Sequence, residues 1–205
     1  MPTLALLASG SGTLLEAFLD SDVQVSLVVT DRPCRALSIA RERGVETTLV
    51  DRQEFGGFGE NFSRDRYSVV LARLLREKRV DLVAMAGFGT VLDAVFFEDF
   101  DGTVLNTHPS LLPHFKGWHA VALALEAGVT ESGCTVHVAT AALDDGPILA
   151  QGRVPVEPGD DEETLHERIK VVEREMYPRV VRQALEALAL GENVATMRYV
   201  SKEAM

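Results

Sequence analysis

Residues 4–13, Leu-Ala-Leu-Leu-Ala-Ser-Gly-Ser-Gly-Thr, decide the class of fold. Residues 4–8 form a continuous apolar run of strand length, which is typical of a strand buried on both faces. A glycine-rich turn, Ser9-Gly10-Ser11-Gly12-Thr13, follows at once, and residues 14–19 have helical character. A buried strand, a tight turn and a helix in this order predict the first βα unit of a parallel sheet.

The same alternation continues through the first half of the chain. We expect further strands at residues 25–30, 47–50 and 81–86, helices at residues 35–43 and 63–78, and a loose loop at residues 54–61. Continuous apolar strands that alternate with amphipathic helices indicate an α/β fold. The predicted architecture is a mostly parallel twisted sheet with helices on both faces.

The second half of the chain predicts antiparallel strands instead. We expect a strand at residues 103–106, a helix at 119–128 and strands at 134–140 and 148–156, with a short connection between the last two. Asp160 and Asp161 are candidate N-caps of a long helix over residues 162–190, which Pro178 is expected to kink or divide. Because no Pro/Ser-rich linker separates the halves, we predict a single domain over residues 1–205.

The composition excludes several classes of function. The 205 residues carry a formal net charge of −11, are 46% hydrophobic and 25% charged, and so are typical of a globular enzyme that does not bind nucleic acid. Cys34 and Cys134 lack the spacing of a disulfide framework, which favours a reducing compartment. The N-terminus lacks the cationic segment of a signal peptide, and no apolar run reaches the ~18 residues of a membrane span. We therefore predict a cytoplasmic protein without a membrane partner.

The strongest chemical signal is Asn106-Thr107-His108-Pro109-Ser110-Leu111-Leu112-Pro113 at the end of the strand expected from residue 103. Side chains two apart on a strand point to the same face, so Asn106 and His108 are expected side by side. An amide donor beside an imidazole suits carbonyl chemistry, in which one group holds an oxyanion and the other holds or moves a proton.

Asp144 is the natural carboxylate partner for His108. It lies in the turn Leu143-Asp144-Asp145-Gly146-Pro147, whose acids are equally suited to bind solvent or their own backbone. His137 is interpreted as a structural histidine of its strand. No grouping of histidine, cysteine and carboxylate residues has metal-ligand spacing, so we predict no metal.

The glycine-rich turn is a candidate anion site, because a strand-to-helix turn presents backbone N–H groups to a phosphate. A tight turn that needs glycine dihedrals is the structural alternative. Dinucleotide binding is a third possibility, since Asp31 lies about 20 residues further on, where a ribose-binding acid is expected. However, Leu15 replaces the third glycine of that motif, which favours a lone phosphate.

Taken together, these motifs resemble the folate-dependent formyltransferases over essentially the whole chain. The resemblance is carried by the glycine-rich turn, by the Asn106–Pro113 string, by Gly133-Cys134-Thr135-Val136-His137, and by Asp144-Asp145-Gly146-Pro147-Ile148. It implies a Rossmann-like formyltransferase fold and formyl transfer from the cosubstrate 10-formyltetrahydrofolate to the amine of glycinamide ribonucleotide, in purine biosynthesis. A monomer or a homodimer is expected.

The resemblance also implies which residues bind and react. It places nucleotide-phosphate binding in about residues 1–100, and folate binding and catalysis in about residues 101–205. Asn106 and His108 are expected to stabilise the oxyanion while Asp144 assists proton transfer, and Gly117 and His119 match positions near the reacting groups. The expected substrate-binding residues are Gly12, Thr13, Leu14, Lys170 and Glu173, of which the last two on spacing alone form a surface ion pair. The expected folate-binding residues are Arg64, Phe88, Gly89, Thr90, Val91, Leu92, Asn106, Val138, Ala139, Thr140, Leu143 and Asp144.

The chain departs from the family pattern at a few positions and leaves rival functions open. Gly89-Thr90-Val91 replaces a usual Met-Arg-Ile, so a folate-tail contact by that arginine is absent, and Lys116 stands where proline is frequent. The nearest alternative is formyltetrahydrofolate deformylase, which gives the formyl group to water. Methionyl-tRNA formyltransferase would need a further domain and a basic surface, and a non-catalytic nucleotide-binding module would rest on Gly10, Gly12 and Asp31 alone.

Overall fold

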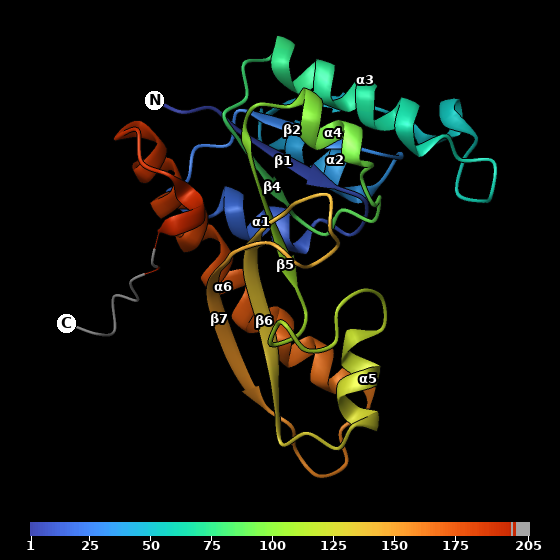
Figure 1. Ribbon diagram of the computed structural model, residues 1–205, viewed down its shortest axis with the longest axis vertical. Helices are drawn as coiled ribbons and strands as arrows, with labels where there is room; N and C mark the ends of the chain where they lie inside the picture. The colour runs from blue at the N-terminus through green and yellow to red at the C-terminus, as the bar shows by residue number, and fades with distance from the viewer. Residues whose placement is uncertain (198, 200–205) are drawn as a thin grey trace. The chain divides into compact units, whose positions relative to one another are not determined.

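The computed structural model describes residues 1–197 and 199 (Figure 1). The chain divides into two compact units, Met1–Val104 and Leu105–Met205. This division falls close to the predicted boundary between the halves near residue 100, whereas the single domain stays a prediction. None of the described helices has both the length and the apolar character that crossing a membrane requires.

The first unit is built on parallel strands. They are β1 (Leu4–Ala8), β2 (Leu27–Thr30), β3 (Glu46–Leu49) and β4 (Leu82–Met85), and they lie in the order β3-β2-β1-β4. Every residue of β1, β2 and β4 is buried, as continuous apolar runs predict for strands that are covered on both faces. The parallel arrangement predicted for the first half is thus confirmed.

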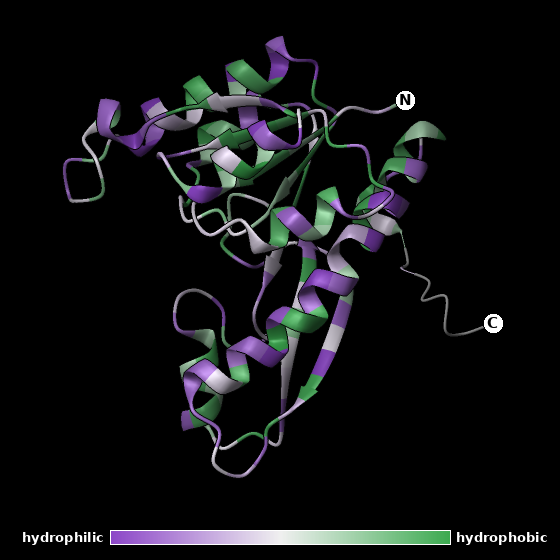
Figure 2. Ribbon diagram, turned by 180° about the vertical axis from the view of Figure 1, so that it is seen from behind, coloured by the Kyte–Doolittle hydropathy of each residue, from purple (hydrophilic) through white to green (hydrophobic). Residues whose placement is uncertain are grey.

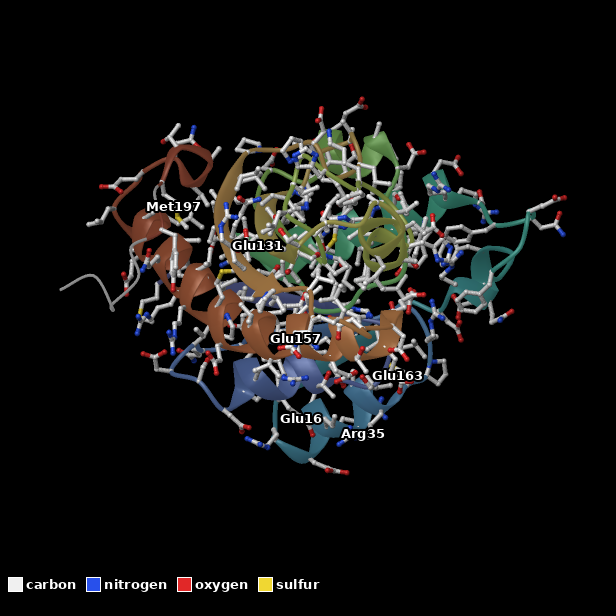
Figure 3. All side chains as sticks on the ribbon, turned by 90° about the horizontal axis from the view of Figure 1, so that it is seen from below. Glu16, Arg35, Glu131, Glu157, Glu163 and Met197 are labelled. Carbon is white, nitrogen blue, oxygen red and sulfur yellow. The ribbon has the colours of Figure 1, made fainter. Side chains whose placement is uncertain are left out.

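The helices of this unit are α1 (Thr13–Leu19), α2 (Arg35–Glu42), α3 (Arg64–Glu77) and α4 (Ala94–Asp99). Crossovers between parallel strands are right-handed, so the steps from β1 to β2 to β3 place α1 and α2 on one face, and the reversed step to β4 places α3 on the other. Contacts agree, because α1 packs on α2 and α3 packs on α4. The Arg35 Nη2 and Glu16 Oε1 atoms, 3.0 Å apart, join α1 to α2, and both residues are labelled in Figure 3.

Two short elements of the first unit differ from the prediction. The 3₁₀-helix η1 (Arg52–Phe55) overlaps the first two residues of the loose loop predicted at 54–61. Helix α4 was not predicted, since six residues are too few to show a helical period. It is stabilised by the Asp93 side chain, which accepts from the Val95 N–H at its start, and by the buried ring of Phe96.

The second unit is built on antiparallel strands, as predicted. They are β5 (Thr103–His108), which begins just before the unit boundary, β6 (Glu131–Val138) and β7 (Ile148–Pro155), with β6 paired to both of its neighbours. Helix α5 (Ala120–Glu126), the long helix α6 (Glu162–Ala189) and the 3₁₀-helix η2 (Val194–Thr196) complete the described part of this unit. Strand β5 is longer than predicted and includes both Asn106 and His108.

Helix α6 covers one face of these strands, and its first residues explain why its N-terminus could be predicted from the sequence. The Asp161 side chain accepts from the Thr164 N–H and the Thr164 hydroxyl accepts from the Asp161 N–H, which is a capping box. Figure 2 shows alternating hydrophilic and hydrophobic bands along the helix. Pro178 was expected to kink or divide the helix. It does not divide it, because buried residues on both sides, among them Ile169 and Val181, hold one continuous helix against the sheet, and a kink stays a prediction.

Candidate active site

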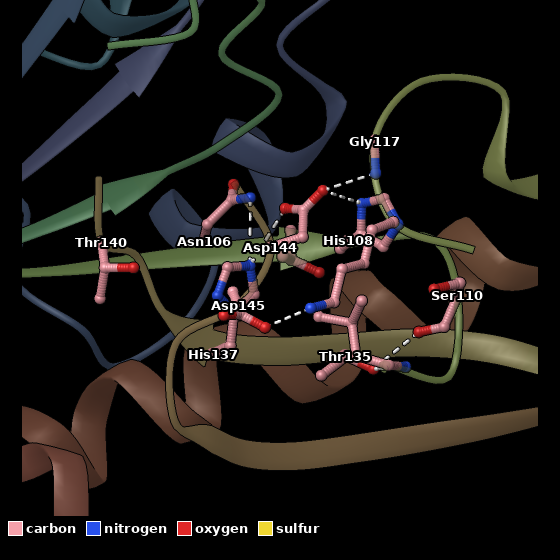
Figure 4. A network of polar contacts seen from close by, with 12 residues as sticks. Asn106, His108, Ser110, Gly117, Thr135, His137, Thr140, Asp144 and Asp145 are labelled. Atoms are coloured by element: carbon pink, nitrogen blue, oxygen red, sulfur yellow. Dashed lines mark hydrogen bonds and ion pairs between the residues drawn. The ribbon is translucent and has the colours of Figure 1, made fainter. Parts of the chain in front are cut away.

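The pairing of β5 with β6 places four polar side chains on one face of the second unit. Asn106 lies opposite His137, and His108 lies opposite Thr135. Residues that are directly opposite in an antiparallel pair point to the same face, and so do residues two apart on one strand. Asn106 and His108 therefore share a face, as predicted, and the register adds His137 to them (Figure 4).

Asp144 reaches this face from the turn between β6 and β7. Its Oδ2 atom lies 3.3 Å from the Nδ1 atom of His108 and accepts from the backbone N–H of Gly117 at 2.9 Å. Its Oδ1 atom lies 3.5 Å from the Nε2 atom of His137. The carboxylate thus sits between two imidazoles, as Figure 4 shows, and the structure brings together the three residues predicted to be catalytic.

The backbone of the turn explains how Asp144 is held there. Asp144 has φ 51°, in the left-handed region, where aspartate is one of the better tolerated residues. The N–H of Val138 donates to the carbonyl of Pro147 at 2.9 Å and closes the turn. A Cβ atom on Gly146 would lie 1.8 Å from the Val138 carbonyl oxygen, so only glycine fits at that position.

The surroundings of Asp144 keep it ionised. Burial alone raises the pKa of its carboxyl group, but hydrogen bonds from His137 and the Gly117 N–H, together with the positive charge of His108, outweigh burial and lower the pKa. A permanent carboxylate beside two imidazoles is available both to orient a ring and to accept a proton.

His108 has an acceptor at each ring nitrogen. Its Nε2 atom lies 2.7 Å from the carbonyl oxygen of Phe115, which can only accept, so Nε2 carries a hydrogen. Its Nδ1 atom faces the Asp144 carboxylate, which also only accepts. The Asp144 carboxylate is therefore positioned to stabilise a positive charge on this buried ring.

Asn106 is the loosely held member of the cluster. The side chain is half-buried, and its Nδ2 atom lies 3.4 Å from Nε2 of His137, at the long end of a hydrogen bond. The Nδ1 atom of His137 faces the carbonyl of Val138 at 3.1 Å, so Nε2 is free to accept from Asn106 or, when protonated, to donate to Asp144. A weakly engaged amide is a donor that a reacting oxygen atom can take over.

His137 is the site residue that sequence reasoning missed. It was interpreted as a structural strand histidine, but it lies between Asn106 and Asp144 and is almost fully buried. The position of His137 follows from the register of β5 against β6. That register pairs residues about 30 positions apart, so a local sequence pattern cannot show it. Gly117 joins the cluster through its N–H, whereas the exposed His119 takes part in none of its polar contacts in the described part of the chain.

The loop before Gly117 is fastened at several points. Thr135 donates through its hydroxyl to the Ser110 carbonyl at 2.6 Å and accepts from the Leu112 N–H at 3.0 Å. Lys116 forms an ion pair with Asp145, the residue next to Asp144. The side chain of Trp118 is 67% exposed beside this loop. These hydrogen bonds and the ion pair hold the loop so that the Gly117 N–H meets the Asp144 carboxylate.

The remaining predicted folate-binding residues of the second unit lie on the same turn as Asp144. Val138 ends β6 and accepts from His137 through its carbonyl. Thr140 donates through its hydroxyl to the carbonyl of Ala142 at 3.2 Å, and Leu143 is 49% exposed. Ala139 lies between Val138 and Thr140. The structure therefore places this predicted set around one carboxylate.

Lys170 and Glu173 are not paired with each other, so the ion pair expected from their spacing is wrong. The Lys170 Nζ atom lies 2.8 Å from the Glu167 carboxylate, one turn earlier on α6. Glu173 instead accepts from the hydroxyl of Thr107 at 3.0 Å. Thr107 alternates with Asn106 and His108 on β5, so Glu173 lies on the face opposite the catalytic cluster. Burial raises the pKa of Glu173.

In the first unit, the glycine-rich turn has the expected strand-to-helix geometry. Gly12 is the N-cap of α1 with φ 79°, and a Cβ atom there would lie 2.8 Å from the Ile39 side chain of α2. Thr13 is exposed, but the Leu14 side chain is buried, so only the backbone of Leu14 can meet a ligand. A tight turn packed on α2 therefore accounts for Gly12 on its own, and phosphate binding stays a prediction.

Asp31 is not available to bind a ribose. It is fully buried, and both of its oxygens accept from the Arg32 guanidinium at 2.9 Å. The Thr90 hydroxyl donates to it at 2.6 Å. Burial raises its pKa, but these hydrogen bonds outweigh burial and lower it. This closed network removes the acid on which the dinucleotide-binding alternative depended.

The first-unit residues predicted to bind folate follow the ends of strands or begin a helix. The turn after β4 holds Phe88, Gly89, Thr90, Val91 and Leu92, with the Gly89 N–H donating to the Ser9 hydroxyl at 2.7 Å. Arg64 is exposed at the start of α3. The carboxyl ends of parallel strands are where α/β folds bind ligands. Among the described residues, no group of three or more His, Cys, Asp and Glu side chains is placed to hold a metal.

Comparison with known proteins identifies the family. The model of the formyl transferase family matches residues 3–181. The phosphoribosylglycinamide formyltransferase of Mycobacterium tuberculosis is 47% identical over 191 residues, which are 91% of this chain and 84% of that protein. The crystal structure of glycinamide ribonucleotide transformylase 1 from Symbiobacterium toebii gives a TM-score of 0.78 at 38% identity, covering 87% of this chain and 84% of that one.

A second solved structure agrees with the first. Glycinamide ribonucleotide transformylase 1 from Geobacillus kaustophilus gives a TM-score of 0.80 at 36% identity, covering 90% of this chain and 99% of that one. These likenesses confirm the predicted formyltransferase fold, including the mixture of parallel and antiparallel strands. From the family model and the relatives together, the chain belongs to the formyl transferase family.

Proposed function

We propose that this protein is a phosphoribosylglycinamide formyltransferase. It transfers the formyl group of 10-formyltetrahydrofolate to the amine of glycinamide ribonucleotide, and the products are formylglycinamide ribonucleotide and tetrahydrofolate. The family and the relatives support this reaction. The observation that carries the chemistry is the Asp144 carboxylate, held ionised between His108 and His137 beside the amide of Asn106.

The reaction begins with direct attack by the amine. The nitrogen lone pair forms a bond to the formyl carbon, and the carbonyl electrons move to the oxygen, which becomes an oxyanion. Asn106 donates its loosely held N–H to this oxyanion. His108 adds positive charge beside the oxyanion. It can also donate an N–H to the oxyanion if that N–H turns away from the Phe115 carbonyl or the Asp144 carboxylate.

The tetrahedral intermediate then has to exchange a proton. The attacking nitrogen carries one proton too many and the leaving folate nitrogen lacks one. Asp144, directly or through water, takes the proton from the first and delivers it toward the second, after which the bond from carbon to the folate nitrogen breaks. The lowered pKa of Asp144 keeps it in the accepting form at the start of each cycle.

Other parts of the assignment rest on the resemblance. The backbone of Gly12, Thr13 and Leu14 is proposed to bind the phosphate, and Lys170 and Glu173 to bind the nucleotide within the second unit. The turn after β4 and Arg64, in the first unit, and Val138 to Asp144, in the second, are proposed to bind the folate. A cytoplasmic location fits the two free cysteines, Cys34 and Cys134, and a monomer or homodimer stays a prediction.

The first experiment is formyl transfer followed by folate absorbance, with and without glycinamide ribonucleotide. We expect folate release to depend on the ribonucleotide and to match the amount of formylated product. Release at the same rate in its absence would identify a hydrolase, in line with the deformylase alternative, and would overturn the proposed function.

A further inference from the structure

A cluster of arginines and aromatic rings in the first unit has no role in the function proposed above. The guanidinium of Arg52 lies between two phenylalanine rings, with its Cζ atom 4.6 Å from the centroid of Phe58 and 3.9 Å from that of Phe62. The Cζ atom of Arg32 lies 4.1 Å from the same Phe58 ring. Aromatic faces attract guanidinium groups and restrict their motion.

Hydrogen bonds fix the orientation of Arg52 further. Its Nε atom donates to the carbonyl of Gly57 and its Nη1 atom to the hydroxyl of Thr90, each at 3.2 Å. Thr90 in turn donates to the buried Asp31. The guanidinium is therefore tied to the turn that follows β4 and is fixed before any ligand arrives.

Arg52 has no ion-pair partner in the described part of the chain. Arg32 occupies both oxygens of Asp31, and among the described residues no carboxylate oxygen lies within 4.0 Å of the Arg52 guanidinium. Burial lowers the pKa of Arg52 and outweighs the attraction of Asp31, which raises it, and Arg52 remains a cation. Arg52 is therefore a half-buried guanidinium whose own ion pair is open to a ligand.

Several N–H groups of Arg52 have no hydrogen-bond partner among the described residues. A guanidinium has five N–H groups, and the protein acceptors described above use one on Nε and one on Nη1. Among the described residues, no acceptor receives a hydrogen bond from its Nη2 atom. A fixed cation with free, forked N–H groups is suited to a carboxylate.

We propose that Arg52 binds a carboxylate of the glutamyl group of 10-formyltetrahydrofolate and so sets the specificity for that end of the cosubstrate. This inference rests on the proposed function. The cosubstrate carries two carboxylates at that end, and the Thr90 contact joins Arg52 to the turn proposed to bind folate. The phosphate of the ribonucleotide has its own proposed site on the glycine-rich turn after β1.

The test compares 10-formyltetrahydrofolate with 10-formyltetrahydropteroate, which lacks the glutamate. For Arg52→Met we expect the KM for the complete cosubstrate to rise about 10- to 100-fold, because a charge-assisted hydrogen bond is lost, with kcat unchanged. The KM for the pteroate should be the same in variant and wild type. Arg41→Met, which removes an exposed arginine of α2, serves as the control and should change neither KM.

Other outcomes overturn the inference. An equal rise in both KM values would mean that Arg52 only supports the fold, and a rise in the KM for glycinamide ribonucleotide would assign the cation to the phosphate. Arg52→Lys keeps the charge without the fork and should raise the KM for the complete cosubstrate less than Arg52→Met. If Arg52→Met unfolds, the lysine variant still decides, because no selective rise for the glutamyl form would refute the role. Failure of the wild type with both cosubstrates would refute the proposed function instead.

Discussion

At the scale of single residues, Asp144 and Asp145 show how surroundings decide what a side chain does. Asp144 is buried, accepts from a backbone N–H and faces two imidazoles. Asp145 is exposed and forms an ion pair with Lys116. Two identical carboxylates that are neighbours in the sequence therefore have different chemistry, and the choice of Asp144 over Asp145 rested on the resemblance to the family and not on spacing.

This pair offers a matched test of the catalytic role. Asp144→Asn should lower kcat about 100- to 10,000-fold, because an amide cannot accept the proton of the attacking amine, while KM changes little. Asp145→Asn removes the same charge one residue away and should stay within about threefold of the wild type. Steady-state kinetics of both variants decide the matter, and similar losses in the two would contradict the role given to Asp144.

At the scale of secondary-structure elements, the prediction succeeded where local sequence determines the structure. The apolar runs of β1 and β4 and the capped start of α6 are visible within a few residues of sequence. Helix α4 was missed because it is short, and His137 because its role depends on the pairing of β5 with β6. Arg52 was missed because its partners lie on loops that are far apart in the sequence.

The turn between β6 and β7 is the element whose shape the chemistry needs. In Gly146→Ala the new methyl group would meet the Val138 carbonyl oxygen at 1.8 Å, so the turn has to move and take Asp144 with it. A displacement of about 1 Å is expected to lower kcat about 100-fold.

The control for this variant is Gly59→Ala, which adds the same methyl group where nothing lies within 4 Å. It should leave kcat and the midpoint of thermal unfolding unchanged. A Gly146→Ala enzyme with full kcat would show that the turn does not have to hold Asp144 where the structure places it.

At the scale of the whole molecule, the acidic side chains with shifted pKa values make the stability of the fold depend on pH. Asp31 and Asp144 act in one direction and Glu173 in the other. The pKa values of Asp31 and Asp144 are lowered, so the stability they contribute is present above the ordinary aspartate range and is lost as the pH falls below it. The pKa of Glu173 is raised by burial, so the folded chain binds that proton more tightly than the unfolded chain does. Glu173 therefore costs stability as the pH rises above the ordinary glutamate range, near ~4.

Replacing this carboxyl group should make the folded chain more stable at neutral pH. Glu173→Gln retains an oxygen that accepts from Thr107, yet carries no charge to bury. We expect a higher midpoint of urea unfolding than in the wild type at pH 7.5, and a difference that shrinks as the pH falls toward 4. Glu167→Gln, on an exposed part of the same helix, is the control. An advantage that persists unchanged at low pH would argue against charge burial as the cause.

Trp118, the single tryptophan of the chain, gives this protein an intrinsic optical label. The indole is largely exposed and directly follows Gly117, whose N–H holds the Asp144 carboxylate. All tryptophan emission therefore originates from one point beside the reacting groups. The wavelength of this emission and its quenching by a soluble quencher report on the solvent exposure of that loop, and the measurement needs no mutation, dye or isotope.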